Sequence, residues 1–300
     1  MVIAVFDIGG TSIKYGLVDE KGTIMMERSF PTYAHLGGET IVRNVIRTGQ
    51  DLQDAWPMDG ISISTAGQID NKEGTVVHAT DTIPGYTGTR IKDVVQDATG
   101  LPVTVENDVN CTALGEYWMG AAQQSKHFLC VTVGTGIGGA LFVNGELYTG
   151  AHFSAGEIGH MNLYPNGKSC PCGSAGCWER YASSSALSNM IAETYGETMN
   201  LIDFFDRLRA DDATGWTLFR RWVDDVTTGL MSLVHTLDPE LIVIGGGISA
   251  QGDFLLEPIR SALMDKVMPN YARHLDVTMA HFYNQANLLG AAKHFLNENQ

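Results

Sequence analysis

Two segments of this chain share one pattern, in which an apolar run is followed by a short glycine-rich turn and a second apolar run. In residues 2–19 the order is VIAVF, DIGGT and IKYGLV, and in residues 128–146 it is FLCVTV, GTGIGG, ALFV and NGE. Antiparallel strands joined by a tight turn of glycine and hydroxyl residues give this pattern, so we predict a β-hairpin in each segment. Such a repeat within one chain predicts an internal duplication, with one hairpin opening each of two domains.

The rest of the chain alternates between short apolar runs and longer runs with helical periodicity. We predict strands at residues 61–67, 103–107, 240–247 and 276–282. We predict helices at residues 39–55, 91–99, 111–118, 183–195, 201–209, 216–237, 254–267 and 287–296. Alternating strands and helices favour an α/β fold, and the hairpins make its sheets mixed. With 300 residues the chain is long enough for two cores.

The charge balance excludes several classes of partner. Lys and Arg total 19 against 34 Asp and Glu, which gives a net charge of −15, and no run of basic residues offsets it. Nucleic acid and anionic membranes would repel such a chain. No apolar stretch approaches the roughly 20 residues that span a bilayer, and the opening MVIAVFDIGGT has no signal-peptide pattern. We therefore expect a soluble cytoplasmic protein with no nucleic-acid and no membrane partner.

The turn at residues 7–14, DIGGTSIK, has the composition of a phosphate site. Glycines let backbone N–H groups approach an anion closely, and Thr11, Ser12 and Lys14 add donors for phosphate oxygens. Asp7 ends the first strand, and its carboxylate could hold Mg²⁺ through water. The alternative is an ordinary tight turn that needs glycine for a positive φ.

Two more glycine-rich segments follow apolar strands. The turn at residues 132–139, TVGTGIGG, precedes no helical pattern, so it is neither a P-loop nor a dinucleotide motif. Together with the first turn, one in each domain, it could clamp a polyphosphate across a cleft. The segment at residues 244–249, IGGGIS, could lie against an adenine or a ribose, or it could be a plain strand–helix connection.

The segment VENDVN, residues 105–110, places Asn107 and Asp108 where a predicted strand ends. Strand ends are where α/β sheets hold reactive groups. A carboxylate there can take the proton of a hydroxyl nucleophile, as phosphoryl transfer to an alcohol requires. The alternative is that Asp108 only caps the following helix.

A cluster of three of the five cysteines, CPCGSAGC, lies ten residues after a histidine. Clustered thiolates with one imidazole form a tetrahedral set suited to a structural Zn²⁺, because no open position is implied. The four predicted ligands are His160, Cys170, Cys172 and Cys177. Glu157 and Glu179 flank the set, and paired carboxylates of this kind bind vicinal sugar hydroxyls. The alternative for both glutamates is solvated surface charge.

The motifs of this chain, and their order along it, resemble those of the ROK family, which groups bacterial sugar kinases with related repressors. They are DIGGT, END, TVGTGIGG, GEIGH followed by CPCGSAGCWE, and GGGI, and together they extend over essentially the whole chain. GEIGH with the cysteine signature is the most specific of them, and the glycine turns are weaker.

The resemblance implies a two-domain actin-like ATPase fold, a duplicated ribonuclease H-like fold with a central cleft. We expect a smaller N-terminal domain of residues 1–116 plus 287–300 and a larger domain of residues 117–286 that carries the zinc loop. The implied activity is ATP-dependent phosphorylation of a hexose hydroxyl, O6 in the leading case, with Asp108 as general base. The implied cofactors are ATP, Mg²⁺ and a structural Zn²⁺, and the family members are commonly homodimers.

The resemblance also assigns roles to individual residues. The sugar hydroxyls would be held by Asn107, Glu157, His160 and Glu179, with one ring nitrogen of the histidine on zinc and the other on the sugar. The nucleotide and its Mg²⁺ would lie against Asp7, Gly9, Gly10, Thr11, Lys14, Thr132, Gly134, Thr135, Gly136, Gly246 and Gly247.

Two loops depart from the family pattern and leave the sugar open. Ala66 stands where many members have proline, and residues 79–86 differ from many glucokinases. Glucose is the first expectation, with N-acetylmannosamine and other hexoses or glucosides as alternatives. A sugar-responsive repressor or a non-catalytic ATP- and sugar-binding protein is the alternative of another class. The net charge and the position of the first turn at Asp7 argue against the repressor.

Overall fold

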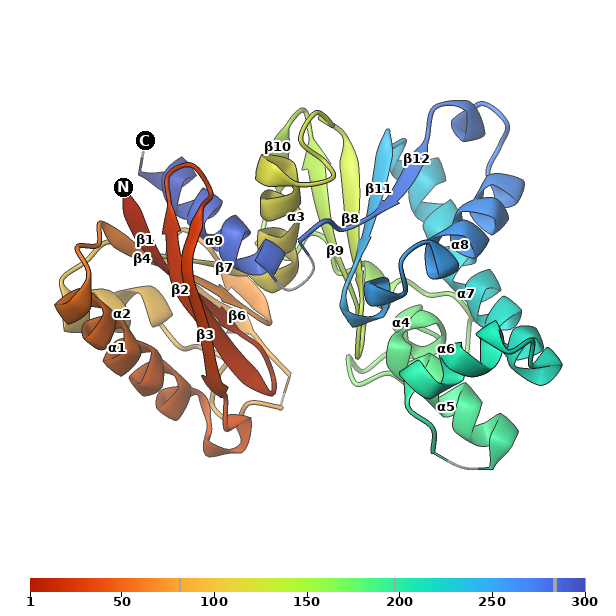
Figure 1. Cartoon of the computed structure of the whole chain (residues 1–300), viewed down its shortest axis with the longest axis horizontal. Coiled ribbons are helices and arrows are strands. Elements are labelled where there is room, and N and C mark those ends of the chain that lie inside the picture. The colour runs from red at the N-terminus through yellow and green to blue at the C-terminus, as the bar shows by residue number, and fades with distance from the viewer. Residues whose placement is uncertain (81, 197, 283–284, 300) are drawn as a thin grey trace. The chain divides into compact units, whose positions relative to one another are not determined.

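The computed structural model describes residues 1–80, 82–196, 198–282 and 285–299, which form two compact units (Figure 1). The first unit contains residues 1–125, 140–155 and 280–300, and the second contains residues 126–139 and 156–279. The predicted domain limits at residues 116 and 287 stay a prediction, because a compact unit need not be an independently folding domain. No helix in the described ranges is long and apolar enough to cross a membrane.

The first unit is built on a five-stranded sheet of order β3-β2-β1-β4-β7. Its strands are β1 (Val2–Ile8), β2 (Ser12–Asp19), β3 (Ile24–Pro31), β4 (Gly60–Thr65) and β7 (Val103–Asn107). β1, β2 and β3 pair antiparallel, whereas β4 and β7 continue the sheet in parallel. The predicted hairpin at residues 2–19 and the strand at residues 103–107 are therefore confirmed, and the strand predicted at residues 61–67 is found at Gly60–Thr65. A separate pair of short strands consists of β5 (Gln68–Asp70) and β6 (Thr75–His78).

Helices cover both faces of this sheet (Figure 1). On one face Ala4 and Phe6 of β1 pack with α1 (Gly38–Ala55) and α2 (Ile91–Thr99). On the other face Ile3 and Val5 pack with α3 (Asp108–Met119) and α9 (Ala286–Glu298). Because successive strand residues point to opposite faces, a strand buried on both sides needs an unbroken apolar run, which is the run that opens the sequence.

The second five-stranded sheet has the order β10-β9-β8-β11-β12. Its strands are β8 (Phe128–Val133), β9 (Ile137–Val143), β10 (Glu146–Tyr148), β11 (Leu241–Gly245) and β12 (Asp276–Met279). As in the first sheet, an antiparallel meander is followed by two strands in parallel. The two sheets therefore have the same topology, as an internal duplication predicts.

The second unit, which contains β8, β11 and β12 of this sheet, carries the longest helix, α7 (Ala213–Leu237), and its neighbours. These are α4 (Glu179–Ala182), α5 (Ser184–Tyr195), α6 (Leu201–Arg209) and α8 (Asp253–Lys266). Phe205 of α6 and Phe219 and Trp222 of α7 are buried, and successive ring pairs lie 5.8–5.9 Å apart. Aromatic burial of this kind supplies much of the apolar core of this unit.

Four short 3₁₀ segments lie in the connections of the described chain. They are η1 (Ala34–Leu36), η2 (Ile158–His160), η3 (Gly247–Gln251) and η4 (Tyr271–Arg273). Of these, η2 lies within the GEIGH motif, and η3 begins within the GGGI motif.

The contact between α3 and α9 depends on two glycines. A Cβ atom at residue 290 would overlap the carbonyl oxygen of Cys111, and one at residue 115 would overlap the carbonyl oxygen of Ala286. The two helix backbones therefore approach closely at positions where no side chain fits.

We predict opposite effects for two buried helical glycines of the first unit. Gly290→Ala should lower the free energy of unfolding by about 3 kcal/mol, because the backbones of α3 and α9 must move apart. Gly49→Ala should raise it by up to about 1 kcal/mol, because its Cβ would meet only ordinary contacts, 3.4 Å from Ile61, and alanine favours the helix. Urea unfolding followed by circular dichroism measures both, and equal effects would contradict the close helix contact.

Candidate functional site

The first glycine turn, between β1 and β2, is fixed by a neighbouring threonine. The N–H of Gly9 donates to the carbonyl oxygen of Ser12 at 3.2 Å. Thr32 donates its hydroxyl to the carbonyl oxygen of Gly9 at 2.6 Å and its N–H to that of Thr11 at 2.9 Å. Neither Gly9 nor Gly10 has a positive φ, and no atom lies within 4 Å of a Cβ built on Gly10. These two positions therefore do not need glycine for a positive φ. Instead, the absence of a side chain lets a ligand approach the exposed backbone closely.

Asp7 lies buried at the end of β1, opposite Lys14 of β2 in the strand register. Its Oδ1 atom accepts hydrogen bonds from the Ser64 hydroxyl at 3.0 Å and from Nδ2 of Asn287 at 2.9 Å. Burial raises the pKa of Asp7, while Asn287, Ser64 and Lys14 oppose that rise. Within the described ranges, Oδ2 accepts no hydrogen bond, so one carboxylate oxygen remains for a cation or its bound water.

Asn107, and not Asp108 alone, caps α3. Its Oδ1 accepts the N–H groups of Val109 at 2.8 Å and Asn110 at 3.1 Å. Its Nδ2 donates to the carbonyl oxygen of Gly67 at 2.9 Å and to Oδ1 of Asp108 at 3.0 Å. Helix capping, the alternative role for Asp108, is therefore performed mainly by Asn107.

Asp108 is the first residue of α3 and is only partly exposed. Burial, together with the negative charge of Asp7, raises the pKa of Asp108 to about 6, against the opposing hydrogen bonds from the Val109 N–H and Asn107. Such a carboxylate is ionised at neutral pH but is a stronger base than an exposed one. Its chemistry therefore fits acceptance of a hydroxyl proton.

In the second unit, the turn between β8 and β9 lies against Glu179. The N–H of Gly134 donates to the carbonyl oxygen of Gly136 at 3.0 Å, and the N–H of Ser184 donates to that of Gly134 at 2.9 Å. A Cβ on Gly136 would lie 2.5 Å from Oε2 of Glu179. Thr135 is exposed at the tip of the turn. The turn is thus held against the helix that begins at Glu179.

The glycines after β11 approach the same turn. Gly246 has a φ of 86°, and a Cβ there would overlap the backbone of Val133, the last residue of β8. Thr132 pairs with Gly245 in the register of β8 and β11. Gly247 is exposed, and no atom lies within 4 Å of a Cβ built on it. The predicted nucleotide-binding glycines of this unit therefore lie around one strand end.

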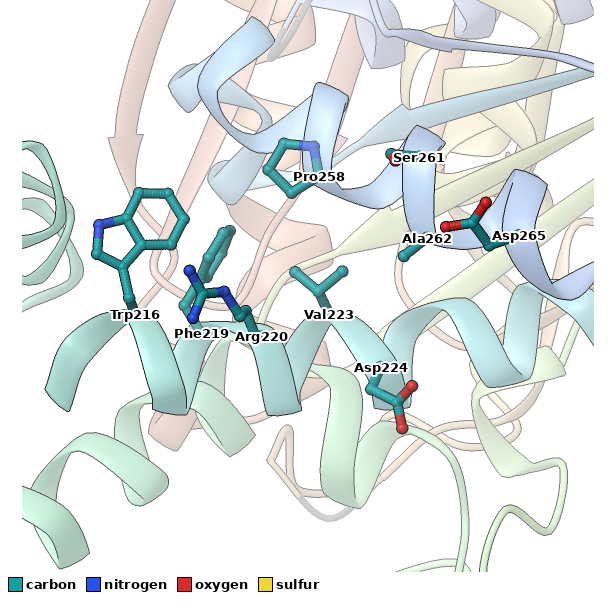
Figure 2. A pocket seen from close by; sticks show the side chains of 9 residues that line it. All are labelled: Trp216, Phe219, Arg220, Val223, Asp224, Pro258, Ser261, Ala262 and Asp265. Atoms are coloured by element: carbon teal, nitrogen blue, oxygen red, sulfur yellow. The ribbon is translucent and has the colours of Figure 1, made fainter. Parts of the chain in front are cut away.

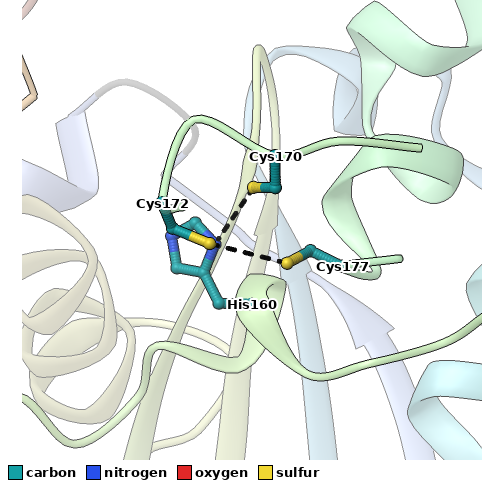
Figure 3. A group of neighbouring side chains, drawn as sticks. All are labelled: His160, Cys170, Cys172 and Cys177. Atoms are coloured by element: carbon teal, nitrogen blue, oxygen red, sulfur yellow. Dashed lines mark hydrogen bonds between the residues drawn. The ribbon is translucent and has the colours of Figure 1, made fainter. Parts of the chain in front are cut away.

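The predicted zinc ligands converge (Figure 3). One ligand atom from each of the four residues lies within 4.8 Å of all the others, and the residues are His160, Cys170, Cys172 and Cys177. Sγ of Cys172 and Sγ of Cys177 are 3.6 Å apart, and Sγ of Cys170 is 3.6 Å from Nδ1 of His160. A tetrahedral zinc with bonds of about 2.0–2.3 Å requires ligand separations of about 3.5–3.8 Å. The donor set and its spacing therefore fit Zn²⁺.

The imidazole of His160 presents different nitrogens to the cysteines and to Glu157. Nδ1 is the nitrogen beside Cys170, and it lies 3.8 Å from Oε1 of Glu179. Nε2 lies 3.8 Å from Oε2 of Glu157. The His160 side chain is 37% exposed, that of Glu157 45% and that of Glu179 19%. Glu157 and Glu179 therefore lie beside the four candidate metal ligands, and all three side chains have part of their surface open to a ligand.

The cysteine loop is anchored to the core by Trp178. The tryptophan is fully buried, donates its indole N–H to the carbonyl oxygen of Asp225 at 3.0 Å, and occupies the space left by Gly229 of α7. Gly173 and Gly176 have φ values of 91° and 80°, as the tight folding of the loop requires. The loop therefore has a rigid attachment on one side and the ligand cluster on the other.

A groove of about 270 Å³ lies elsewhere in the second unit, between α7 and α8 (Figure 2). None of the predicted site residues lines it. Its walls are formed by Trp216, Phe219, Arg220, Val223, Asp224, Pro258, Ser261, Ala262 and Asp265.

The predicted site residues thus form two groups, one in each unit. The first unit brings Asp7 and Lys14 together with Asn107 and Asp108, and the second gathers the metal ligands, both glutamates and the remaining glycines. Sequence reasoning missed Ser64 and Asn287, which donate hydrogen bonds to Asp7, and Thr112, which donates to Asn287. No motif marks them, although a serine within the apolar strand ISIST is a weak signal. Of the unusual loop at residues 79–86, Asp81 lies outside the described residues.

This chain is similar to known proteins over nearly its whole length. The profile of the ROK family matches residues 3–298. The glucokinase of Thermotoga maritima is 32% identical over 300 residues, covering 95% of this chain and 94% of that protein. The beta-glucoside kinase of Listeria monocytogenes is 34% identical over 302 residues, covering 99% and 98%. The crystal structure of a ROK family glucokinase from Streptomyces griseus, in complex with glucose and AMPPNP, has a TM-score of 0.84 and 32% identity, covering 97% of this chain and 98% of that one. These likenesses confirm the predicted actin-like ATPase fold, and the chain belongs to the ROK family.

Proposed function

We propose that this protein transfers the γ-phosphoryl group of ATP to a hydroxyl group of a hexose. The observation that carries the proposal is Asp108, a partly buried carboxylate at a strand end whose pKa is raised to about 6 beside a second carboxylate, Asp7. Asp108 accepts the proton of the sugar hydroxyl as that oxygen attacks the γ-phosphorus and ADP leaves. Positioning and charge stabilisation supply most of the rate, and the base supplies a smaller part.

Four side chains are proposed to hold the sugar hydroxyls: Asn107, Glu157, His160 and Glu179. Carboxylates accept sugar O–H groups in charge-assisted hydrogen bonds, and Nε2 of the partly exposed His160 side chain can donate one. Asn107 differs from the other three because all its amide bonds are already made within the protein. Asn107 can bind a sugar hydroxyl only by giving up one of its two existing N–H hydrogen bonds. Its main proposed role is therefore to orient Asp108.

The two glycine turns and the glycines after β11 are proposed to hold the nucleotide. Their N–H groups and the hydroxyls of Thr11 and Thr135 suit phosphate oxygens, and the exposed position of Gly247 suits the nucleoside. The free oxygen of Asp7 would hold Mg²⁺ through water, and the cation would neutralise phosphate charge. Lys14, opposite Asp7, adds a positive charge at the same place.

Glucose is the first substrate to test, because relatives across the full length of the chain are glucokinases. A beta-glucoside kinase is equally similar, so a glucoside stays an alternative, as do N-acetylmannosamine and other hexoses. A coupled assay of ADP release over this panel, ranked by kcat/KM, identifies the sugar. No stimulation by any sugar would favour a non-catalytic binding protein. The homodimer and the cytoplasmic location stay predictions.

Replacing the proposed base should separate activity from stability. We predict that Asp108→Asn lowers kcat at least about a hundredfold and leaves sugar affinity within a few-fold. The same change should stabilise the protein by about 2 kcal/mol above pH 6, because the raised pKa means that the folded state disfavours the charged carboxylate. The gain should shrink as the pH falls through 6 towards 4, where Asp108 is protonated. Steady-state kinetics and urea unfolding between pH 5 and 8 measure both effects.

Asp93→Asn is the matched control for this prediction. Asp93 also lies in the first turn of a helix in the same unit, but its side chain is 41% exposed and paired with Arg90. This variant should keep full turnover and lose less than about 1 kcal/mol of stability. Near-normal turnover of Asp108→Asn would refute the assignment of the base.

Glycines without a conformational role allow a direct test of nucleotide contact. Gly10→Ala and Gly134→Ala should leave the melting temperature nearly unchanged, because neither residue has a positive φ and a Cβ at either position meets no atom within 4 Å. The added methyl groups should raise the Kd for Mg-AMPPNP at least about tenfold by blocking approach of phosphate to the backbone. Calorimetry measures the affinity for Mg-AMPPNP. Gly100→Ala is the converse control: because Gly100 has a φ of 70°, this variant should have a lower melting temperature and an unchanged Kd.

Zinc is proposed as a structural ion that fixes the sugar-binding side of His160. We predict about one zinc per chain by elemental analysis. Cys172→Ser should reduce the bound zinc and raise the KM for the sugar by at least about tenfold, because the histidine ring loses its fixed orientation. Cys111→Ala, a change of a buried thiol outside the cluster, should leave the zinc content unchanged. Full zinc content in Cys172→Ser would contradict the proposed ligand set.

A further inference from the structure

Asp7 and the helix that carries Asp108 are joined by two polar side chains that no sequence motif marks. We infer that Asn287 is a positioning residue for Asp7, holding one carboxylate oxygen so that the other faces the cation of a bound Mg-nucleotide. The inference rests on the proposed function and adds to it a residue from the far end of the chain.

The contacts around Asn287 form a continuous chain. Its Nδ2 donates to Oδ1 of Asp7 at 2.9 Å. Its Oδ1 accepts a hydrogen bond from the hydroxyl of Thr112 on α3. The same hydroxyl lies 3.0 Å from the carbonyl oxygen of Asp108, one turn earlier in that helix. Asn287 therefore connects the proposed cation ligand on β1 to the first turn of the helix that begins with the proposed base.

The chemistry of these groups fixes the orientation of the amide. A carboxylate offers only acceptors, so the NH₂ group of Asn287 must face Asp7. The amide oxygen then needs a donor, which Thr112 supplies. A flipped amide would set oxygen against oxygen at Asp7, so the carboxylate of Asp7 selects the orientation of Asn287. The Thr112 hydroxyl supports that orientation by donating to the amide oxygen.

A neutral donor suits this position better than a charged one. Among the described residues, the side-chain donors to Asp7 are the Ser64 hydroxyl and the Asn287 amide, both uncharged. They stabilise the buried carboxylate without neutralising it, so its negative charge remains available to a cation. A lysine or arginine in place of Asn287 would compete with Mg²⁺ for the same charge. Asn287 is itself held at the start of α9, where a side chain can be positioned by the packed helix.

Among the described residues, three titratable groups interact with Asp7. Lys14 on β2 favours the ionised form of Asp7, while Asp7 disfavours the charged forms of Asp108 and of the Cys111 thiol on α3, which Glu106 also affects. A second carboxylate placed at residue 287 would meet Asp7 at hydrogen-bond distance. When protonated, it could donate to Asp7 as the amide does, and when ionised it would repel Asp7.

The test compares Asn287→Ala, Asn287→Asp and wild type by calorimetric binding of Mg-AMPPNP between pH 6 and 8.5. Asn287→Ala should raise the Kd about tenfold at every pH, because a hydrogen bond to a charged group is lost. Asn287→Asp should bind nearly as wild type at the lowest pH, and its Kd relative to wild type should rise at least tenfold as the pH increases. A residue that only supported the fold would give no such dependence on pH.

Two further variants keep the test decisive. Gln285→Ala, at the same end of α9 but bonded to Glu27, should bind Mg-AMPPNP as wild type does. Thr112→Val keeps Asn287 but removes its donor, so the Kd should rise about threefold. Sugar affinity measured without nucleotide should stay unchanged in all variants. The inference would be overturned by an unchanged Kd in Thr112→Val. It would also be overturned if the Kd of Asn287→Asp relative to wild type did not change with pH.

Failure of this inference differs from failure of the proposed function. If wild type releases ADP in response to a sugar while the Asn287 variants bind Mg-AMPPNP normally, only the role of Asn287 is wrong. If wild type binds Mg-AMPPNP but no sugar stimulates ADP release, the proposed function is wrong whatever the variants show.

Discussion

The close contact between α3 and α9 is the constraint on which the first unit depends. Gly115 and Gly290 leave no side chain between the two backbones, so the helices approach until carbonyl oxygens occupy the space of the missing Cβ atoms. This approach brings Thr112 of α3 within hydrogen-bond distance of Asn287 of α9. Because Thr112 and Gly115, like Asn287 and Gly290, are three residues apart on one helix face, the close backbone packing also positions the polar network around Asp7.

The candidate base illustrates a conflict between stability and chemistry. Asp108 is held in a partly buried place beside Asp7, where its charge is disfavoured and its pKa is raised. The fold tolerates this because Asn107 takes over the capping of α3 and the N-terminal end of that helix favours a negative charge. The second unit fixes its polar groups differently, because its cysteine loop brings four candidate metal ligands together on one side and is anchored by buried Trp178 on the other.

Most regular elements follow from local patterns. The helices at residues 91–99 and 201–209 and the strand at residues 103–107 have the predicted limits, because each has clear periodicity and a defined end. The strand β3 escaped prediction because it lies at the sheet edge and is mostly exposed, so its sequence IMMERSFP carries little apolar alternation. The short strands β5, β6 and β10 lack enough residues to show a period.

The sequence by itself determined the two glycine hairpins, the cluster of candidate metal ligands and the carboxylate at the start of α3, because each is encoded by residues that are near neighbours in the chain. Only the tertiary structure decided which neutral groups surround Asp7 and that Asn107 caps the helix ahead of Asp108. Ser64 and Asn287 lie 57 and 280 residues from Asp7, and their hydrogen bonds exist only after the sheet and α9 have packed. A pattern along the chain records local periodicity and ligand type, whereas the pKa of a buried group depends on every element that packs against it.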